Sequence, residues 1–288
     1  MVLGIQALSL KDGAEGLRAR PSLAAIAGRI PWWLVALVGL ALAGVAAAVA
    51  SDSYAIIFSA LATGIPVTLG VAIVAFVIAI LLGLGLALLR SSPLRIAREG
   101  ATFYIELVRG LPMLVILYYI AFVGAPALAG ILNAILAPLI STGLIQPLTP
   151  RDFDFATRAI LALSLGYAAF IAEIFRAGIE SVDKGQVEAA LALGLSRAQV
   201  MRRVVLPQAI RNVLPALGNE FVAVIKDSSL VSALGVQDIT QLGKVYAAST
   251  FKFFETYNVV AFFYLCLTVS LSMLVRRLEG RLREGRSP

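Results

Sequence analysis

Histidine is absent from this chain of 288 residues, and cysteine occurs only at Cys266. The lack of histidine removes the commonest general base and proton-relay side chain. A single cysteine excludes an intramolecular disulfide, and the sequence predicts no metal site. Charge is also scarce, because charged residues make up 14% of the chain whereas hydrophobic residues make up 60%. This composition excludes an ordinary soluble globular domain.

Apolar runs of about twenty residues recur along the chain, and a helix of that length crosses the hydrocarbon core of a bilayer. We therefore predict an all-α integral membrane protein with about six transmembrane helices, at residues 32–50, 64–89, 103–122, 156–178, 209–233 and 256–275. Residues 124–155 contain another apolar run, but prolines interrupt it repeatedly. Because proline breaks helices, we interpret this segment as an external hairpin or re-entrant piece.

The first predicted span has a second interpretation. Ala48-Val49-Ala50 before Ser51 resembles the cleavage site of a signal peptide. Such a peptide would have an n-region of about thirty residues, which is unusually long. Both interpretations place Ser51 outside, so topology does not distinguish between them.

The basic residues are distributed unevenly between the predicted spans. Eighteen of the twenty-four Lys and Arg residues lie in four regions: the first thirty residues, the segment after the second span, the stretch from Arg176 to Arg211 around the loop between the fourth and fifth spans, and the segment after the sixth span. Short cytoplasmic segments of membrane proteins are enriched in Lys and Arg, so we expect both termini in the cytoplasm. The net charge of +7 therefore reflects topology and does not indicate a nucleic-acid partner.

The polar stretch between the fourth and fifth predicted spans carries the clearest local signals. Glu, Ala and Leu dominate residues 188–195, and these residues favour a helix. Gly194 stands where that helix would end, because glycine accepts the left-handed conformation that reverses the chain. Ser196, with Gln199 three residues later, predicts a capping box for a second short helix. The stretch is therefore predicted to form a helix, a turn and a helix outside the membrane.

This stretch resembles the EAA loop of ABC importer permeases. The resemblance rests on the spacing of Glu188, Ala189, Ala190, Gly194, Leu206 and Pro207, with Val204 where isoleucine is common. Further stretches resemble the polar amino acid subfamily of these permeases, namely residues 103–112, 168–179, 206–211, 219–220 and 226–230. Phe170, Ala177 and Ser228 depart from the subfamily pattern. The resemblance covers residues 64–278.

The resemblance implies a five-helix type I importer core with one additional N-terminal helix. It divides the chain into a cytoplasmic tail (1–31), the additional helix with a short periplasmic link (32–63), the permease domain (64–278) and a cytoplasmic tail (279–288). It implies a bacterial inner-membrane protein that pairs with a second permease copy or a close relative. Two cytoplasmic ATPases and a periplasmic amino acid-binding protein complete the implied assembly.

In such an assembly the EAA loop is the coupling helix, which docks into a groove on the ATPase. The permease itself is not an enzyme and holds no cofactor, because ATP and Mg²⁺ are bound by the partner ATPase. We therefore expect Glu188, Ala189, Ala190, Gly194, Leu206 and Pro207 to belong to the ATPase-coupling element.

Charged residues within the predicted spans are the other candidates for function. An ionised side chain at the bilayer centre costs roughly 2.5–3.5 kcal/mol on insertion scales, so it faces protein or water. Residues three apart share a helix face, which predicts structural ion pairs for Glu106 with Arg109 and Glu173 with Arg176. The fifth span supplies candidates for the translocation path, or alternatively for helix packing in a dimer, at Glu220, Lys226, Asp227 and Ser228.

Two other functional classes compete with an ATP-driven importer. An ion-coupled secondary amino acid transporter requires buried proton or sodium relays and often shows internal repeats, but this chain has no histidine and no clear repeat. An intramembrane enzyme is disfavoured because no His-Glu-x-x-His, Gly-x-Ser-x-Gly or paired aspartate motif is present.

Overall fold

The computed structural model describes residues 51–284, together with Trp32, Ala36, Gly39, 42–44 and Ala46. The chain divides into two compact units, residues 1–46 and residues 47–288. The described positions of the first unit are helical. The predicted span at 32–50 and its cleavage alternative lie largely outside the described residues, so both remain predictions.

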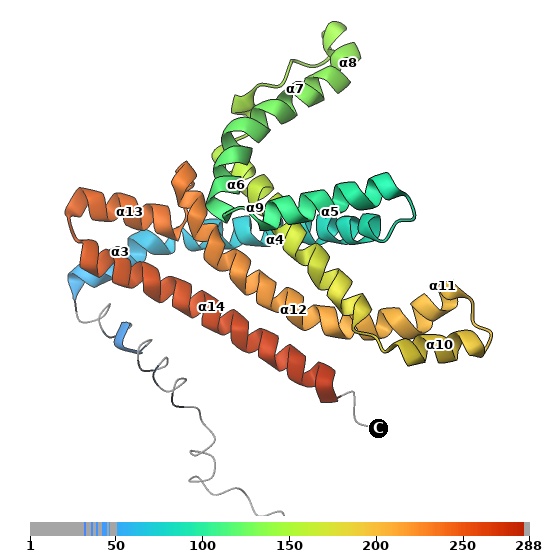
Figure 1. Ribbon diagram of the computed structural model, residues 1–288. Coiled ribbons are helices and arrows are strands. Elements are labelled where there is room, and N and C mark those ends of the chain that lie inside the picture. Colours follow the sequence, from blue (N-terminus) through green and yellow to red (C-terminus); the bar gives the residue numbers. More distant parts are fainter. Residues whose placement is uncertain are drawn as a thin grey trace, which may run out of the picture. The chain divides into compact units, whose positions relative to one another are not determined.

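The second unit is built from helices throughout its described residues (Figure 1). This confirms the predicted all-α class. The elements in chain order are α3 (Asp52–Ala62), α4 (Ile65–Arg90), α5 (Arg95–Arg109), α6 (Met113–Tyr119), the π-helix η1 (Ile120–Gly124), α7 (Ala125–Ile135), α8 (Ala137–Ser141), the 3₁₀ turn η2 (Pro150–Asp152), α9 (Phe155–Glu180), α10 (Lys184–Ala192), α11 (Arg197–Val200), the π-helix η3 (Met201–Val205), α12 (Leu206–Asp227), the 3₁₀ helix η4 (Ser228–Leu234), α13 (Ile239–Thr250) and α14 (Phe253–Glu284).

Small residues form the centre of this unit. Helix α4 packs along α9, and α12 contacts both α9 and α14. Ala72, Ala75 and Ala79 of α4 are buried in one cluster with Ala159 and Ala162 of α9. Small side chains at a helix interface let two backbones approach closely, which is a common basis of association within membranes.

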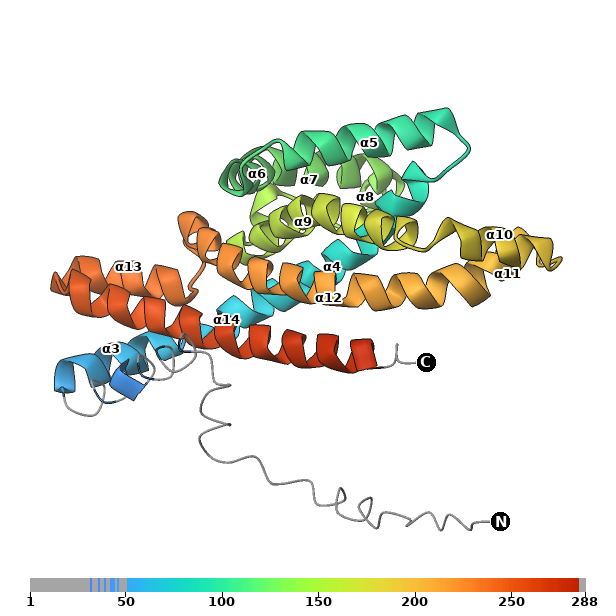
Figure 2. The same ribbon diagram turned by 60° about the horizontal axis from the view of Figure 1, so that its bottom comes forward.

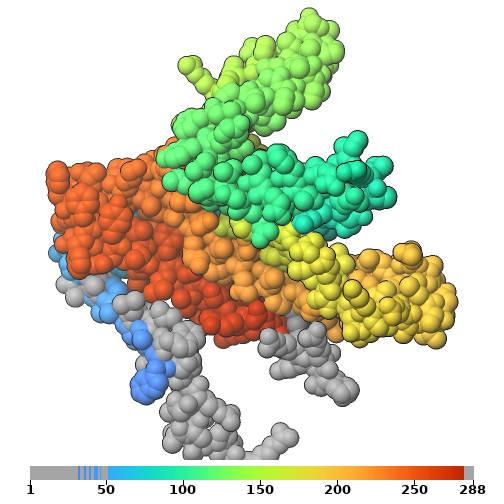
Figure 3. All heavy atoms as spheres, in the orientation of Figure 1, coloured from blue at the N-terminus to red at the C-terminus, as the bar shows by residue number. Residues whose placement is uncertain are grey.

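The helices place α10 and α11 at one end of the unit and α3 and α13 at the other. Both ribbon views show this separation (Figures 1 and 2). Figure 3 shows α10 and α11 projecting from the body of the unit at its right edge. The helix–turn–helix stretch therefore lies far from α13, as expected if the two occupy opposite sides of a membrane.

Four helical stretches within the described residues are long and apolar enough to cross a membrane: Asp52–Arg90, Met113–Ile135, Phe155–Glu180 and Phe253–Arg281. Helix α12 is not among these stretches, and it carries the charged residues Arg211, Glu220, Lys226 and Asp227. Its role as the predicted fifth span, and the total of six, therefore remain predictions.

The predicted third span, 103–122, was placed incorrectly. Helix α5 ends at Arg109, and a new helix starts at Met113 and continues to Ile135. Pro112 lacks an amide hydrogen and has extended backbone (ψ 139°), which separates the two helices. Much of the apolar run in residues 124–155 consequently belongs to a candidate span rather than to an external hairpin.

A buried polar cluster joins α13 to α4 and α14. Asp238 is fully buried and caps α13, accepting from the Gln241 amide at 2.8 Å and from the Tyr264 hydroxyl at 3.0 Å. The Ile239 amide donates to Thr68 Oγ1 at 3.2 Å. Burial raises the pKa of the Asp238 carboxyl above its ordinary value, and these hydrogen bonds oppose that rise.

The topology can be tested by cysteine labelling in a Cys266→Ser background. Gln146 and Ser196 are both exposed, and we predict that they lie on opposite sides of the membrane. A cysteine at Gln146 should react with an impermeant maleimide applied from the periplasm, whereas a cysteine at Ser196 should react only after the membrane is permeabilised. External labelling at Ser196 would contradict both the orientation and the coupling role of this stretch.

Candidate functional site

Residues 184–207 contain α10, α11 and η3 and are named the coupling stretch here after the role predicted for them. Their first helix ends in a complete Schellman motif. Helix α10 runs from Lys184 to Ala192, and Gly194 follows it with a φ of +85°. The Leu195 amide donates to the Ala190 carbonyl at 3.2 Å, and the Gly194 amide donates to the Leu191 carbonyl at 2.9 Å. These are the two bonds that define the motif, so the glycine predicted from the sequence makes the turn.

The second helix begins with the predicted capping box. The Ser196 amide donates to Gln199 Oε1 at 2.8 Å, and the Gln199 amide donates to Ser196 Oγ at 3.4 Å. Helix α11 then passes through the π-helical turn of η3 into α12 at Leu206. Pro207 has no amide hydrogen, so it suits the first turn of α12, where the amide would have no partner within the helix. The π-helical turn just before it is of a kind that often occurs at functional positions.

The coupling stretch has a small apolar core of its own. Ala190 is buried in it with Val182, Val200, Val205 and Ala209. The other residues expected to couple to an ATPase are exposed: Glu188, Ala189, Gly194, Leu206 and Pro207. The structure thus assigns Ala190 to internal packing and leaves the others available on the surface.

Two exposed leucines at the turn were missed by sequence reasoning. Leu193 is 83% exposed and Leu191 is 41% exposed. Isolated exposed leucines are common, but these two lie in the last turn and at the C-cap of α10, directly before Gly194. Their position in a polar segment, next to the glycine that ends the helix, could have indicated that they are exposed.

Side-chain hydrogen bonds tie the coupling stretch to the long helices. Gln208 Nε2 of α12 donates to Gln186 Oε1 of α10 at 2.6 Å. Asn212 Nδ2 of α12 donates to Ser181 Oγ, at the end of α9, at 2.8 Å. These two hydrogen bonds link α10 and the end of α9 to α12.

Glu173 forms the centre of an ion-pair network. Arg176 Nη2 lies 2.7 Å from Glu173 Oε2, and Arg176 Nη1 lies 2.5 Å from Glu180 Oε2. Arg90 of α4 also pairs with Glu173. The expected Glu173–Arg176 contact is thus present, while Arg90 and Glu180 were missed because their contribution depends on how α4 and α9 pack.

The expected contact between Glu106 and Arg109 is not formed. Within the described residues Glu106 has no ion pair, and the guanidinium of Arg109 lies over the Phe170 ring, 6.0 Å from its centre. Arg109 is the last residue of α5, directly before the Gly110–Pro112 break. Its side chain therefore reaches across to α9 instead of pairing along its own helix.

The four path candidates separate into different environments. Tyr167 of α9 donates to Asp227 Oδ2 at 2.8 Å. Ser228 is fully buried and donates to the Ile225 carbonyl at 2.7 Å, while Lys226 is exposed. Glu220 faces an open cavity of about 320 Å³, whose lining residues are Arg109, Phe170, Glu173, Ile174, Ala177 and Glu220.

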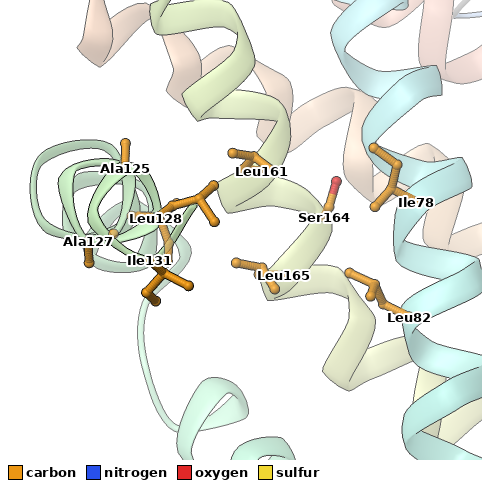
Figure 4. A pocket seen from close by; sticks show the side chains of 11 residues that line it. Ile78, Leu82, Ala125, Ala127, Leu128, Ile131, Leu161, Ser164 and Leu165 are labelled. Carbon is orange, nitrogen blue, oxygen red and sulfur yellow. The ribbon is translucent and has the colours of Figure 1, made fainter. Parts of the chain in front are cut away.

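A second, larger cavity is apolar. Its volume is about 380 Å³, and residues of α4, α7 and α9 surround it, including Leu82, Leu128 and Leu165 (Figure 4). The Ser164 hydroxyl at its wall already donates to the carbonyls of Ala75 and Ile160. This cavity offers no charged group, so it does not suit a polar amino acid.

The helical spans and the capped helix–turn–helix between α9 and α12 define the chain as a membrane-embedded transport component. A family model described as the binding-protein-dependent transport system inner membrane component matches residues 79–284. The chain belongs to this family, and it is a multi-pass membrane protein.

Relatives in bacteria match most of the chain. A probable amino-acid permease protein, YxeN, of Bacillus subtilis (strain 168) is 41% identical over 75% of this chain and 88% of its own length. The glutamine transport system permease protein GlnP of Escherichia coli (strain K12) is 35% identical over 76% of this chain and 91% of its own. The L-cystine transport system permease protein TcyL of Bacillus subtilis (strain 168) is 37% identical over 77% and 87%, respectively.

Solved structures agree with this assignment. A chain of an amino acid ABC transporter crystallised with histidines superposes with a TM-score of 0.66 at 36% identity, over 77% of this chain and 94% of that one. A chain of the inward-facing MetNI methionine ABC transporter gives a TM-score of 0.60 at 18% identity, over 77% and 96%. The latter supports the fold alone.

Proposed function

We propose that this chain is the transmembrane permease subunit of an ATP-driven importer for polar amino acids. The observation that carries the proposal is the projecting α10–α11 stretch, which has its own core and is hydrogen-bonded to α12. The relatives named above as amino acid permeases support the substrate class. The chain carries no catalytic site in this proposal, and ATP and Mg²⁺ bind to the partner ATPase.

Coupling then follows from the contacts of the stretch. The exposed Glu188 and Ala189, together with Leu191 and Leu193, meet the ATPase. Closure of the ATPase pair on ATP displaces α10, and the Gln186–Gln208 hydrogen bond carries that displacement into α12. Because Glu220 and Asp227 lie on α12, the same movement changes their access to the two sides of the membrane.

The complete assembly contains further partners. A second permease copy or close relative provides the other half of the translocation path, and a periplasmic amino acid-binding protein delivers the substrate. Both termini of this chain lie in the cytoplasm, in accordance with the distribution of Lys and Arg. Glu173 and Arg176 act as a structural ion pair.

Reconstitution tests the proposed function directly. The chain should copurify with ATPase subunits, and substrate-loaded binding protein should stimulate ATP hydrolysis and amino acid uptake in proteoliposomes. Radiolabelled L-glutamine, L-cystine and L-arginine are suitable probes, with a proton or sodium gradient replacing ATP as the control. Uptake driven by the gradient without ATP would contradict the proposal and favour an ion-coupled transporter.

A further inference from the structure

The open cavity at Glu220 is lined by charged side chains to which no role in transport has been assigned so far. Its wall carries Arg109 of α5, Glu173 of α9 and Glu220 of α12. Three different helices thus bring two carboxylates and one guanidinium to a space of about 320 Å³. Charged groups that converge on one cavity of a membrane protein commonly mark a substrate pathway.

Glu173 is not free to hold a ligand. Arg90 and Arg176 both pair with it, and Arg176 also pairs with Glu180. This network contains two positive and two negative groups, so its charge is already balanced. The cavity is left with Arg109 and Glu220, and neither has a hydrogen-bond or ion-pair partner in the described part of the chain.

The Phe170 ring supports Arg109 without occupying its donors. The guanidinium lies 6.0 Å from the ring centre, where the face of an aromatic ring attracts a cation. Phenylalanine has no hydroxyl that could accept a hydrogen bond, so the planar set of guanidinium donors stays available. Phe170 and Ala177 are the two positions at which this part of α9 departs from the subfamily pattern, and both line the cavity.

We propose that Arg109 binds the α-carboxylate of the transported amino acid while Glu220 binds its α-ammonium group. A guanidinium and a carboxylate that line one cavity are complementary to the two charges shared by every α-amino acid. The inference rests on the proposed function, and it changes the role of Arg109 from a structural group to a substrate-binding residue. The ligand class is an α-amino acid with a free carboxylate.

The test compares amino acids with their decarboxylated amines. The intact complex with its ATPases is placed in lipid nanodiscs without the binding protein, so that only the permease selects the ligand. The probes are L-arginine with agmatine and L-glutamine with 4-aminobutanamide, and the measurement is equilibrium binding. The wild-type complex should prefer each amino acid over its amine by about tenfold, which is the size expected for a charge-assisted hydrogen bond.

Three substitutions separate binding from structure. Arg109→Gln should abolish the preference for the amino acid, and Arg109→Lys should restore part of it. Glu220→Gln should weaken amino acid and amine alike, because both carry the ammonium group, and so should leave their ratio unchanged. Arg98→Gln is the matched control on α5, since Arg98 does not line the cavity, and it should behave as wild type.

Two results overturn the proposal. One is a wild-type complex that shows no preference for the amino acid over its amine. The other is an Arg109→Gln complex that keeps the wild-type preference. Uptake and ATP hydrolysis with the binding protein are measured in parallel, because they test the transport function independently of this subsite.

Discussion

Replacing Gly194 with valine is expected to abolish the stimulation of ATP hydrolysis by substrate-loaded binding protein and to stop uptake. Gly194 has a φ of +85°, which is an outlier for a β-branched residue. No atom lies within 4 Å of the position that a Cβ would occupy, so the effect acts through the backbone alone. The turn opens, and the hydrogen bond from Leu195 to Ala190 is lost.

Two companion variants show whether backbone conformation is responsible. Gly194→Asn should retain most activity because asparagine tolerates the left-handed region. Glu188→Lys changes one exposed contact and should reduce coupling less than Gly194→Val does. Membrane insertion should be unaffected in all three, since none alters an apolar span. Wild-type uptake and ATP requirement in both Gly194→Val and Glu188→Lys would show that this stretch is not the coupling element.

Replacing Gly64 with alanine is expected to destabilise the folded permease strongly. A Cβ at Gly64 would lie 2.6 Å from the Ile239 amide nitrogen and 2.7 Å from the Asp238 carbonyl carbon. Both are backbone atoms of a turn that Thr68 and Tyr264 already fix, so the turn cannot shift without breaking the polar cluster. Overpacking of this kind typically costs about 1–3 kcal/mol, and the loss of buried hydrogen bonds adds to it.

A neighbouring glycine provides the control. Gly70 lies in α4, and no atom approaches within 4 Å of its Cβ position. Gly70→Ala should therefore keep or slightly raise stability, because alanine favours a helix more than glycine does. The thermal unfolding midpoint of the purified complex in detergent measures both variants. Equal midpoints for Gly64→Ala and wild type would show that α13 does not pack against α4 in this way.

The coupling stretch could be predicted almost completely because its signals are local. The turn at Gly194 and the capping box at Ser196 depend on residues within five positions of each other. The third span was misplaced because residues on both sides of Gly110 and Pro112 were assigned to one helix, although α5 carries charged residues to its end at Arg109 and a new helix starts at Met113. The three-residue spacing predicted that Arg109 pairs with Glu106, but its guanidinium lies over the Phe170 ring of another helix.

Contacts between distant segments were beyond sequence reasoning. Arg90 and Glu173 are 83 residues apart, and Tyr167 and Asp227 are 60 apart. Both contacts require knowledge of which faces of α4, α9 and α12 meet. A single sequence shows that such charges need partners, but it does not show which residues provide them.

The ion pair between Arg90 and Glu173 restricts how the permease can change shape. It fastens the end of α4 to α9, and the small residues further along hold the same two helices together. If one helix slid past the other, the ion pair would break and leave a partly buried charge without its partner, which costs free energy. We therefore expect α4 and α9 to move together as one rigid body.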